Sequence, residues 1–222
     1  MNMKTKFNGK KVIIFLSILA LLSVLGMGVT LALLSTTTNT AKNHFMVLGS
    51  QDISAEVIEP LWTEEVQEAA LTMVPDAAVP KDPAVTNTSE AKFDEYAALQ
   101  IIFTDGKGDA LNEEDYARLM DLLEIQYDAE TPGTNYNTNW VLQGAAQNGA
   151  IYVYNEVLPA GESTEPIFTS VTIKASATIS DMDWIRDTLE GFDICIGGAV
   201  MQAQGVTLPQ AETELTALLS ST

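Results

Sequence analysis

The sequence predicts an all-β fold, a jelly-roll-type β-sandwich with one or two short inserted or terminal helices, preceded by an N-terminal signal helix. Three observations predict it. Roughly seven or eight short segments alternate apolar and polar residues at spacings typical of a sandwich or barrel. No regular succession of crossover helices separates them, which argues against a parallel α/β sheet. The 222 residues suffice for one sandwich and are too few for several large domains.

The N-terminus has the pattern of an export signal. Residues 1–11 carry four lysines, and residues 12–34 form an apolar run of 23 residues without a charge. A basic stretch followed by an apolar run is typical of a secretory signal, and the small residues Thr30 and Ala32 suit a signal peptidase. We therefore expect a signal peptide at 1–32, cleaved after Ala32. The run is also long enough to span a bilayer, so an uncleaved anchor is the alternative. Both place the remainder outside the cytoplasm.

The expected sandwich domain covers residues 51–207, and its first half holds several strand patterns. Alternation predicts half-buried strands, as where Ala97, Leu99, Ile101 and Phe103 share one face. A Glu- and Ala-rich stretch at 63–72 favours a helical turn. The two prolines of 79–83 favour a turn. The strands expected here are 52–59, 84–87 and 95–103.

The middle of the chain contains the clearest helix pattern. Asn112 is a favourable N-cap residue, and it is followed by Tyr116, Leu119, Met120 and Leu123. These four repeat at i, i+3, i+4 and i+7, which predicts an amphipathic helix packed on an apolar surface. A strand is expected at 124–127. The polar stretch 128–139 is expected to be a loop.

The C-terminal part is again β-rich. Strands at 140–142 and 151–154 flank a Gly-bearing connection, which predicts a hairpin. A further strand is expected at 167–173, and 181–189 is expected to be a helical turn or a loop. The long apolar stretch 192–203 predicts a buried central strand. Residues 208–222 are expected to form a short C-terminal helix or tail.

Composition excludes several classes of function. From residue 33 onward there are 7 basic and 30 acidic residues and so a net charge of −23, which repels phosphate backbones and argues against nucleic acid binding. The single cysteine allows no intrachain disulfide. The single histidine cannot build a His-rich zinc site.

No residue pattern predicts catalysis or a cofactor. His44 lacks the second histidine, four residues away, that a zinc peptidase helix needs. Cys195 lies in an apolar strand pattern without a nearby histidine, which favours a packed thiol. Residues 105–109 resemble a calcium loop, but Lys107 occupies a ligand position and Ala110 replaces the turn glycine. We therefore predict no catalytic, cofactor or metal residue. A weak, nonspecific affinity of the acidic body for cations stays open.

Several short motifs occur in order behind the signal. Asn43, Phe45 and Gly49 follow the apolar run, and three longer stretches come later. Together they make the sequence similar to the TasA/camelysin family, exported proteins of Gram-positive bacteria that a SipW-type signal peptidase processes. The later stretches are KDPAVTNT at 81–88, YNEVLPAGEST at 154–164 and GFDI at 191–194.

The resemblance implies a secreted structural protein of the cell surface or biofilm matrix. Its main partner would be itself, and other matrix or cell-wall components are further partners to expect. In such relatives the N-terminal strand of one subunit fits into a groove of the next, which is strand addition in physical terms. The segment 33–50 is the candidate donor here, because its threonines favour β-structure and it carries few charges. The residues proposed for this strand are Leu33, Leu34, Thr36, Thr38, Thr40, Phe45 and Val47.

Alternatives stay open at this point. A Ser/Thr/Asn-rich run after a signal is also typical of a flexible linker. The chain would then be a monomeric surface module that binds or anchors a matrix fibre. A secreted metallopeptidase, the label that some camelysin relatives carry, is the third hypothesis.

Overall fold

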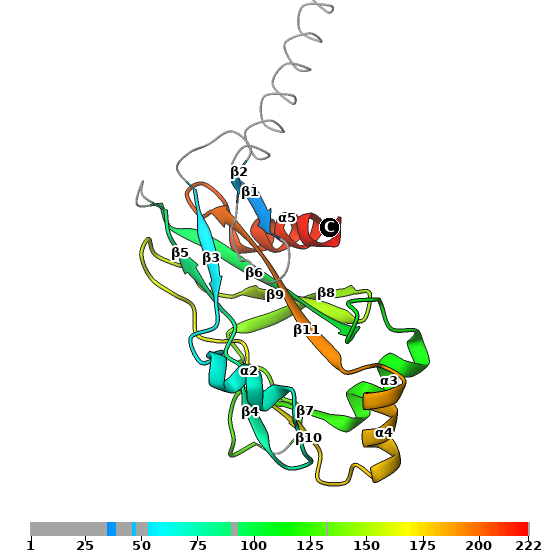
Figure 1. The fold of residues 1–222 in the computed structure, drawn as a ribbon. Helices are drawn as coiled ribbons and strands as arrows, with labels where there is room; N and C mark the ends of the chain where they lie inside the picture. The colour runs from blue at the N-terminus through cyan, green and yellow to red at the C-terminus, as the bar shows by residue number, and fades with distance from the viewer. Residues whose placement is uncertain (1–34, 39–45, 48–52, 90–92, 132, 222) are drawn as a thin grey trace, which may run out of the picture.

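The computed structural model describes residues 35–38, 46–47, 53–89, 93–131 and 133–221 (Figure 1). These residues are mostly β-structure in three antiparallel sheets, compatible with the expected sandwich. The strands are β1 (Ser35–Thr38), β2 (Met46–Val47), β3 (Ala55–Ile58), β4 (Ala78–Pro80), β5 (Ala84–Asn87), β6 (Glu95–Asp105), β7 (Leu123–Gln126), β8 (Trp140–Ala146), β9 (Gly149–Tyr154), β10 (Ser170–Ile173) and β11 (Phe192–Gln202). The helices are α2 (Glu64–Ala70), α3 (Glu113–Leu122), α4 (Ile179–Asp187) and α5 (Leu208–Ser220).

The large sheet has six strands in the order β2-β1-β11-β6-β9-β8. Its centre is the pair β6–β11, in which eleven residues of each strand are matched, from Phe192 opposite Asp105 to Gln202 opposite Glu95. Both strands read as long apolar runs because both of their faces are covered. The central buried strand expected at 192–203 is confirmed.

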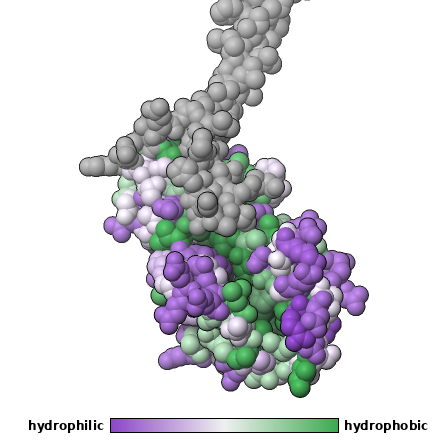
Figure 2. Space-filling model, in the orientation of Figure 1, coloured by the Kyte–Doolittle hydropathy of each residue, from purple (hydrophilic) through white to green (hydrophobic). Residues whose placement is uncertain are grey.

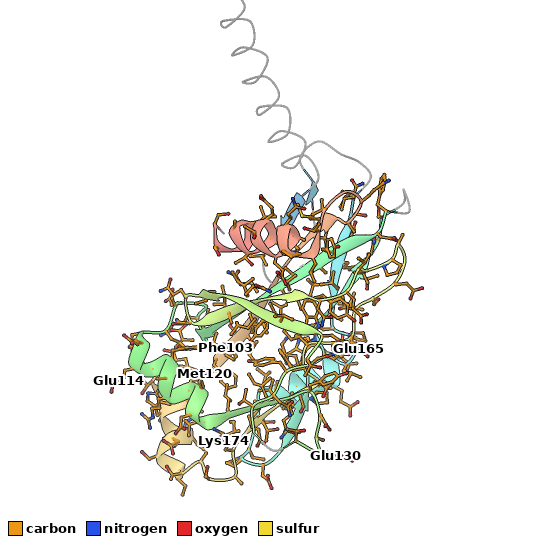
Figure 3. All side chains as sticks on the ribbon, turned by 180° about the vertical axis from the view of Figure 1, so that it is seen from behind. Phe103, Glu114, Met120, Glu130, Glu165 and Lys174 are labelled. Atoms are coloured by element: carbon orange, nitrogen blue, oxygen red, sulfur yellow. The ribbon has the colours of Figure 1, made fainter. Side chains whose placement is uncertain are left out.

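The two smaller sheets, β4-β10-β7 and β3-β5, pack against one face of the large sheet. The principal core lies between them. It draws alternate residues of β6, such as Leu99, Ile101 and Phe103, and residues of the opposing strands, such as Val85 and Ile125. From behind, Phe103 and Met120 lie between the layers, whereas Glu114 points outward from α3 (Figure 3).

Helix α5 covers the opposite face of the large sheet. Its Ala211, Leu215 and Leu219 are almost completely buried against alternate residues of β6, β9 and β11. This second core explains why residues such as Ala98 and Ala199 are also buried, although they point away from the principal core. Within the described residues, no helix has the length and apolar character needed to cross a membrane.

The expectation of one or two helices was too low, since the described part of the chain contains four. Each begins at a capping residue, Thr63, Asn112, Thr178 or Thr207. The helix expected from Asn112 is confirmed, and the Asn112 side chain accepts a hydrogen bond of 2.9 Å from the Asp115 N–H. The sequence of helix α4 is compatible with a helical turn or a loop, because its apolar stripe is short.

One predicted turn is wrong. The proline-bearing stretch 79–83 was expected to be a turn, yet Ala78–Pro80 forms β4 and pairs with β10. Proline is tolerated there because β4 is the edge of its sheet and its outer side needs no N–H donor. A second difference lies at 167–169, where the chain is irregular and the strand begins only at Ser170. Ile167 and Phe168 are nevertheless fully buried, which accounts for their apolar pattern.

Candidate functional site

The predicted donor segment contributes a strand to the large sheet of its own chain. β1 pairs antiparallel with β11, and the register runs from Ser35 opposite Met201 to Thr38 opposite Gly198. Consecutive threonines favour this extended backbone because their branched side chains restrict rotation. The pairing identifies the outer edge of β11 as a surface that accepts a strand of this sequence.

Two short strands form this part of the sheet. β2 pairs back onto β1, with Thr36 opposite Val47 and Thr37 opposite Met46. Of the predicted donor residues, Thr36, Thr38 and Val47 therefore lie in paired strands. The others lie outside the described residues, together with the predicted cleavage site: Ala32, Leu33, Leu34, Thr40 and Phe45.

Strand β1 occupies only part of the available edge. β11 continues from Gly197 back to Phe192, and among the described strands these six residues pair with β6 alone. Among the described residues, no hydrogen bond outside the β6–β11 ladder uses their backbone groups. This segment, which we call the free β11 edge, has the unpaired backbone groups that a further strand would bind.

The free β11 edge is accompanied by apolar surface. Phe192 and Ile194 are only partly buried against the principal core. Figure 2 shows apolar surface following β11 between two polar zones. Apolar side chains next to unpaired backbone groups are what strand addition uses, because side chains add affinity and register to the backbone hydrogen bonds.

Cys195 lies on this edge and is half-buried. Burial raises the pKa of its thiol above the ordinary value. The thiol is therefore protonated at neutral pH and is a weak nucleophile. This agrees with the interpretation of Cys195 as a packing residue.

Glu95 lies at the end of the same sheet, opposite Gln202 and therefore beside the residues that β1 reaches. Its side chain is fully buried, and neither carboxyl oxygen has a hydrogen-bond partner among the described residues. Burial raises the pKa of Glu95 to about 8. Glu95 is not among the residues that the sequence marks as functional. The signal was present, because Glu95 is in phase with the buried Ala97 and Leu99.

Other polar motifs have structural roles. The Asp105 carboxylate accepts hydrogen bonds from the N–H groups of Lys107 (2.9 Å) and Asp109 (2.8 Å), so it closes its own turn. Asn87 is fully buried, and its Nδ2 donates to the carbonyl oxygens of Phe93 and Leu158. Within the described ranges, no three His, Cys, Asp or Glu side chains lie close enough to hold a metal ion.

A comparison with protein-family models finds no match for this chain. Comparisons with curated proteins and with solved structures find none either. The resemblance of the motifs therefore stays a prediction. The pairing of β1 with β11 is the observation that carries a functional proposal.

Proposed function

We propose that this chain is an exported structural protein of the cell surface or biofilm matrix, and that its copies assemble into fibres by exchanging strand β1. One observation carries the proposal. β1 pairs with the outer edge of β11 over four residues, after which β11 offers six further residues that have no partner strand other than β6 among the described residues. A terminal strand held by so few pairs can be replaced by the same strand of a neighbour, as in domain swapping.

The register of β1 gives this exchange a definite geometry. If the donated strand stays extended beyond Thr38, residues 39–44 come opposite residues 197–192 in the same register. The hairpin to β2 cannot coexist with that pairing, because β2 turns the chain back at Met46. An exchanged strand would therefore make ten residue pairs with β11 instead of four. The added backbone hydrogen bonds and the cover over Ile194 favour the exchanged form.

The jelly-roll topology belongs to the same proposal. The chain passes repeatedly between the layers: β6 lies in the large sheet, β7 in a small one, β8 and β9 in the large one, β10 in a small one and β11 in the large one. Such alternation between two packed sheets is typical of Greek-key and jelly-roll sandwiches.

Export completes the proposal. A signal peptide at 1–32, cleaved after Ala32 by a signal peptidase of the SipW type, would leave a free N-terminus close to Ser35. A free end matters because the donated strand has to reach another copy. The net charge of −23 from residue 33 onward opposes association, so assembly should be favoured in mildly acidic solution.

A second candidate function is a monomeric surface module that anchors or caps a matrix fibre. The observation that favours it is the pairing of β1 and β2 within their own chain, since a strand already in place has no need of a neighbour. The two functions differ in whether β1 leaves β11.

A reversible disulfide between β1 and β11, which we call the lock, would distinguish the two candidate functions. We would prepare the chain from Leu33 onward, which keeps every described residue, with Cys195→Ser, Thr36→Cys and Val200→Cys. Thr36 and Val200 are register partners, and such pairs lie at a separation that a disulfide can bridge. Negative-stain electron microscopy would follow the oxidised and reduced protein at neutral and mildly acidic pH. The chain with Thr36→Cys alone is the control.

Filaments that form only after reduction would support exchange of β1. Filaments from the fully oxidised protein would contradict exchange, because the locked strand cannot leave. Monomers under every condition, in the lock variant and in the control, would favour the anchoring module.

A further inference from the structure

The large sheet has a second open edge at β8, on the side opposite β2. β8 pairs with β9 on its inner side, and no other described strand lies on its outer side. In the described part of the chain, no hydrogen bond outside the β8–β9 ladder uses a backbone group of residues 141–146. The outer groups of β8 are thus available to another strand.

This edge lacks two of the features that commonly protect sheet edges, charged residues and prolines. Residues 131–155 contain no charged side chain, in a chain whose net charge is −23 from residue 33 onward. Charged residues and prolines are the usual protection against edge-to-edge pairing, and β8 has neither. It exposes Val141 (38%) and Leu142 (61%) instead. One irregularity between Leu142 and Gly144 bends the strand without ending its pairing with β9.

The strand is also held firmly in place. At its start, the Trp140 Nε1 donates a hydrogen bond of 2.9 Å to the Glu165 carbonyl oxygen, and the Trp140 and Tyr154 rings lie 5.1 Å apart. After its end, the first residue of β9, Gly149, lies so close to β6 that a β-carbon there would be 1.8 Å from the Ile101 carbonyl oxygen. A partner strand therefore meets an edge that is already ordered, and binding costs little conformational entropy.

We propose that the outer edge of β8 is a self-association surface, on which β8 of a second copy pairs antiparallel about a two-fold axis. A second copy fits this edge because its own β8 offers the same uncharged residues, so the contact brings no two charged β8 side chains together, whereas the net charge of the two bodies opposes association. A two-fold axis brings identical edges together and satisfies both at once.

This pairing is independent of the strand exchange proposed above, since β8 and β1 lie toward opposite edges of the sheet. A single β8–β8 contact is small, so the dimer is expected to be weak. If copies also form fibres, which rests on the proposed function, aligned β8 edges would join neighbouring fibres laterally through avidity.

Cysteine scanning tests the pairing directly. In the chain from Leu33 onward with Cys195→Ser, residues 141 to 145 would be replaced by cysteine one at a time, and covalent dimers would be measured after mild oxidation. Gln67→Cys, an exposed position on α2, is the control. Only positions near a two-fold axis approach their own copies within disulfide reach, so the yield should peak at one position at roughly tenfold above the control.

A charge at the edge provides the second test. The Leu142→Lys substitution would be added to whichever other cysteine variant crosslinks best. It should reduce the yield of covalent dimer to that of the Gln67→Cys control. Leu71→Lys is the matched control, because Leu71 is an even more exposed leucine (85%) far from this edge, and it should leave the yield unchanged. High ionic strength should increase crosslinking by screening the repulsion between the bodies.

Two results would overturn the inference. One is a yield no higher than that of Gln67→Cys at all five positions. The other is crosslinking of a β8 cysteine to Thr36→Cys of a second copy in place of another β8, since the edge would then bind the N-terminal segment. Filaments without β8 crosslinks would contradict this inference alone, and β8 crosslinks without filaments would contradict only the proposed function.

Discussion

Glu95 and Leu158 exchange two backbone hydrogen bonds, with the Glu95 N–H donating over 2.9 Å and the Leu158 N–H over 2.7 Å. This isolated bridge holds the start of β6 against the chain that follows β9. It also fixes the Glu95 side chain in the interior, where its carboxyl oxygens have no partner among the described residues. Glu95 thus forms two backbone hydrogen bonds, whereas its carboxyl forms none with the residues that the structure describes.

The first prediction concerns this carboxyl. Burial raises the pKa of Glu95 to about 8 from the model-peptide value of 4.5, so the folded state prefers the protonated acid. Its contribution to stability is therefore present below pH 4.5 and is lost as the pH rises toward 8. Glu95→Gln should raise the free energy of unfolding at neutral pH by about 3 kcal/mol, and by less than about 1 kcal/mol at pH 5.

Urea unfolding of both proteins at pH 5 and at neutral pH measures this difference. Asp94→Asn is the matched control, because Asp94 is the adjacent residue and its side chain is exposed. A Glu95→Gln variant no more stable than the parent at neutral pH would contradict the prediction.

The second prediction concerns a buried ion pair. The Lys81 Nζ lies 2.7 Å from the Glu59 Oε1 and 4.7 Å from the centre of the Trp62 ring. Lys81→Met should lower the free energy of unfolding by about 3 kcal/mol, because it leaves the Glu59 carboxylate without a partner in a mostly buried position. Adding Glu59→Gln should restore part of the loss.

A double-mutant cycle by chemical denaturation measures the coupling between these two side chains. Lys107→Met is the comparison, since the Lys107–Glu190 pair is more than half exposed and its loss should have little effect. Equal losses at the two lysines would argue against a special role for burial.

The third prediction concerns Asn87, whose Nδ2 donates to the Phe93 and Leu158 carbonyl oxygens while its Oδ1 accepts from the Ser89 N–H. Asn87→Asp keeps the shape but removes both donors from a fully buried site. We expect a loss of about 3 kcal/mol at neutral pH. Thr88→Val, which removes one exposed hydroxyl bond to Ser54, should cost less than about 1 kcal/mol. Thermal unfolding compares the two.

The fourth prediction concerns the hairpin that carries β8. A β-carbon at Gly149 would lie 1.8 Å from the Ile101 carbonyl oxygen, so Gly149→Ala has to push β9 away from β6. We expect a loss of at least about 3 kcal/mol. At Gly144 the nearest atom is the Thr216 Cγ2, at 3.0 Å and on a side chain, so Gly144→Ala should be much milder. Denaturant midpoints of the two variants decide this.

The fifth prediction concerns the N-terminal segment. Deleting residues 33–44 from the exported form should abolish any assembly without unfolding the sandwich, because the core residues that the structure describes, from Ile53 onward, already form two extensive cores. Circular dichroism would report the fold and electron microscopy the assembly. Fibres formed by the deletion variant would contradict strand exchange.

Local patterns predicted most of the elements. Alternation located β6 and β11, the spacing after Asn112 located α3, and the Gly-bearing connection located the hairpin of β8 and β9. These patterns succeeded because burial of one face or both faces imposes a period on a strand or helix. The local sequence at Pro80 and in α4 is compatible with more than one secondary structure. There, pairing with a neighbouring strand or packing against another layer decided which structure forms.

The candidate sites depended more on tertiary structure. The sequence marked residues 33–47 as able to form a strand. It did not show that β1 would pair with β11 and with β2, or that six residues of the β11 edge would have no further partner in the described part of the chain. The absence of charge in residues 131–155 is visible in the sequence, whereas the position of β8 at an edge is not.

The sequence by itself determined the β-rich character of the chain, its acidity, its single histidine and single cysteine, and the phase of its long strands. These properties depend on composition and on neighbours within a few positions. Only the tertiary structure decided which strands are central and which are edges, because strand order is set by contacts between residues far apart in the chain. It also decided that Glu95 is buried with no hydrogen-bond partner for its carboxyl among the described residues, since burial depends on what the other layer places above it.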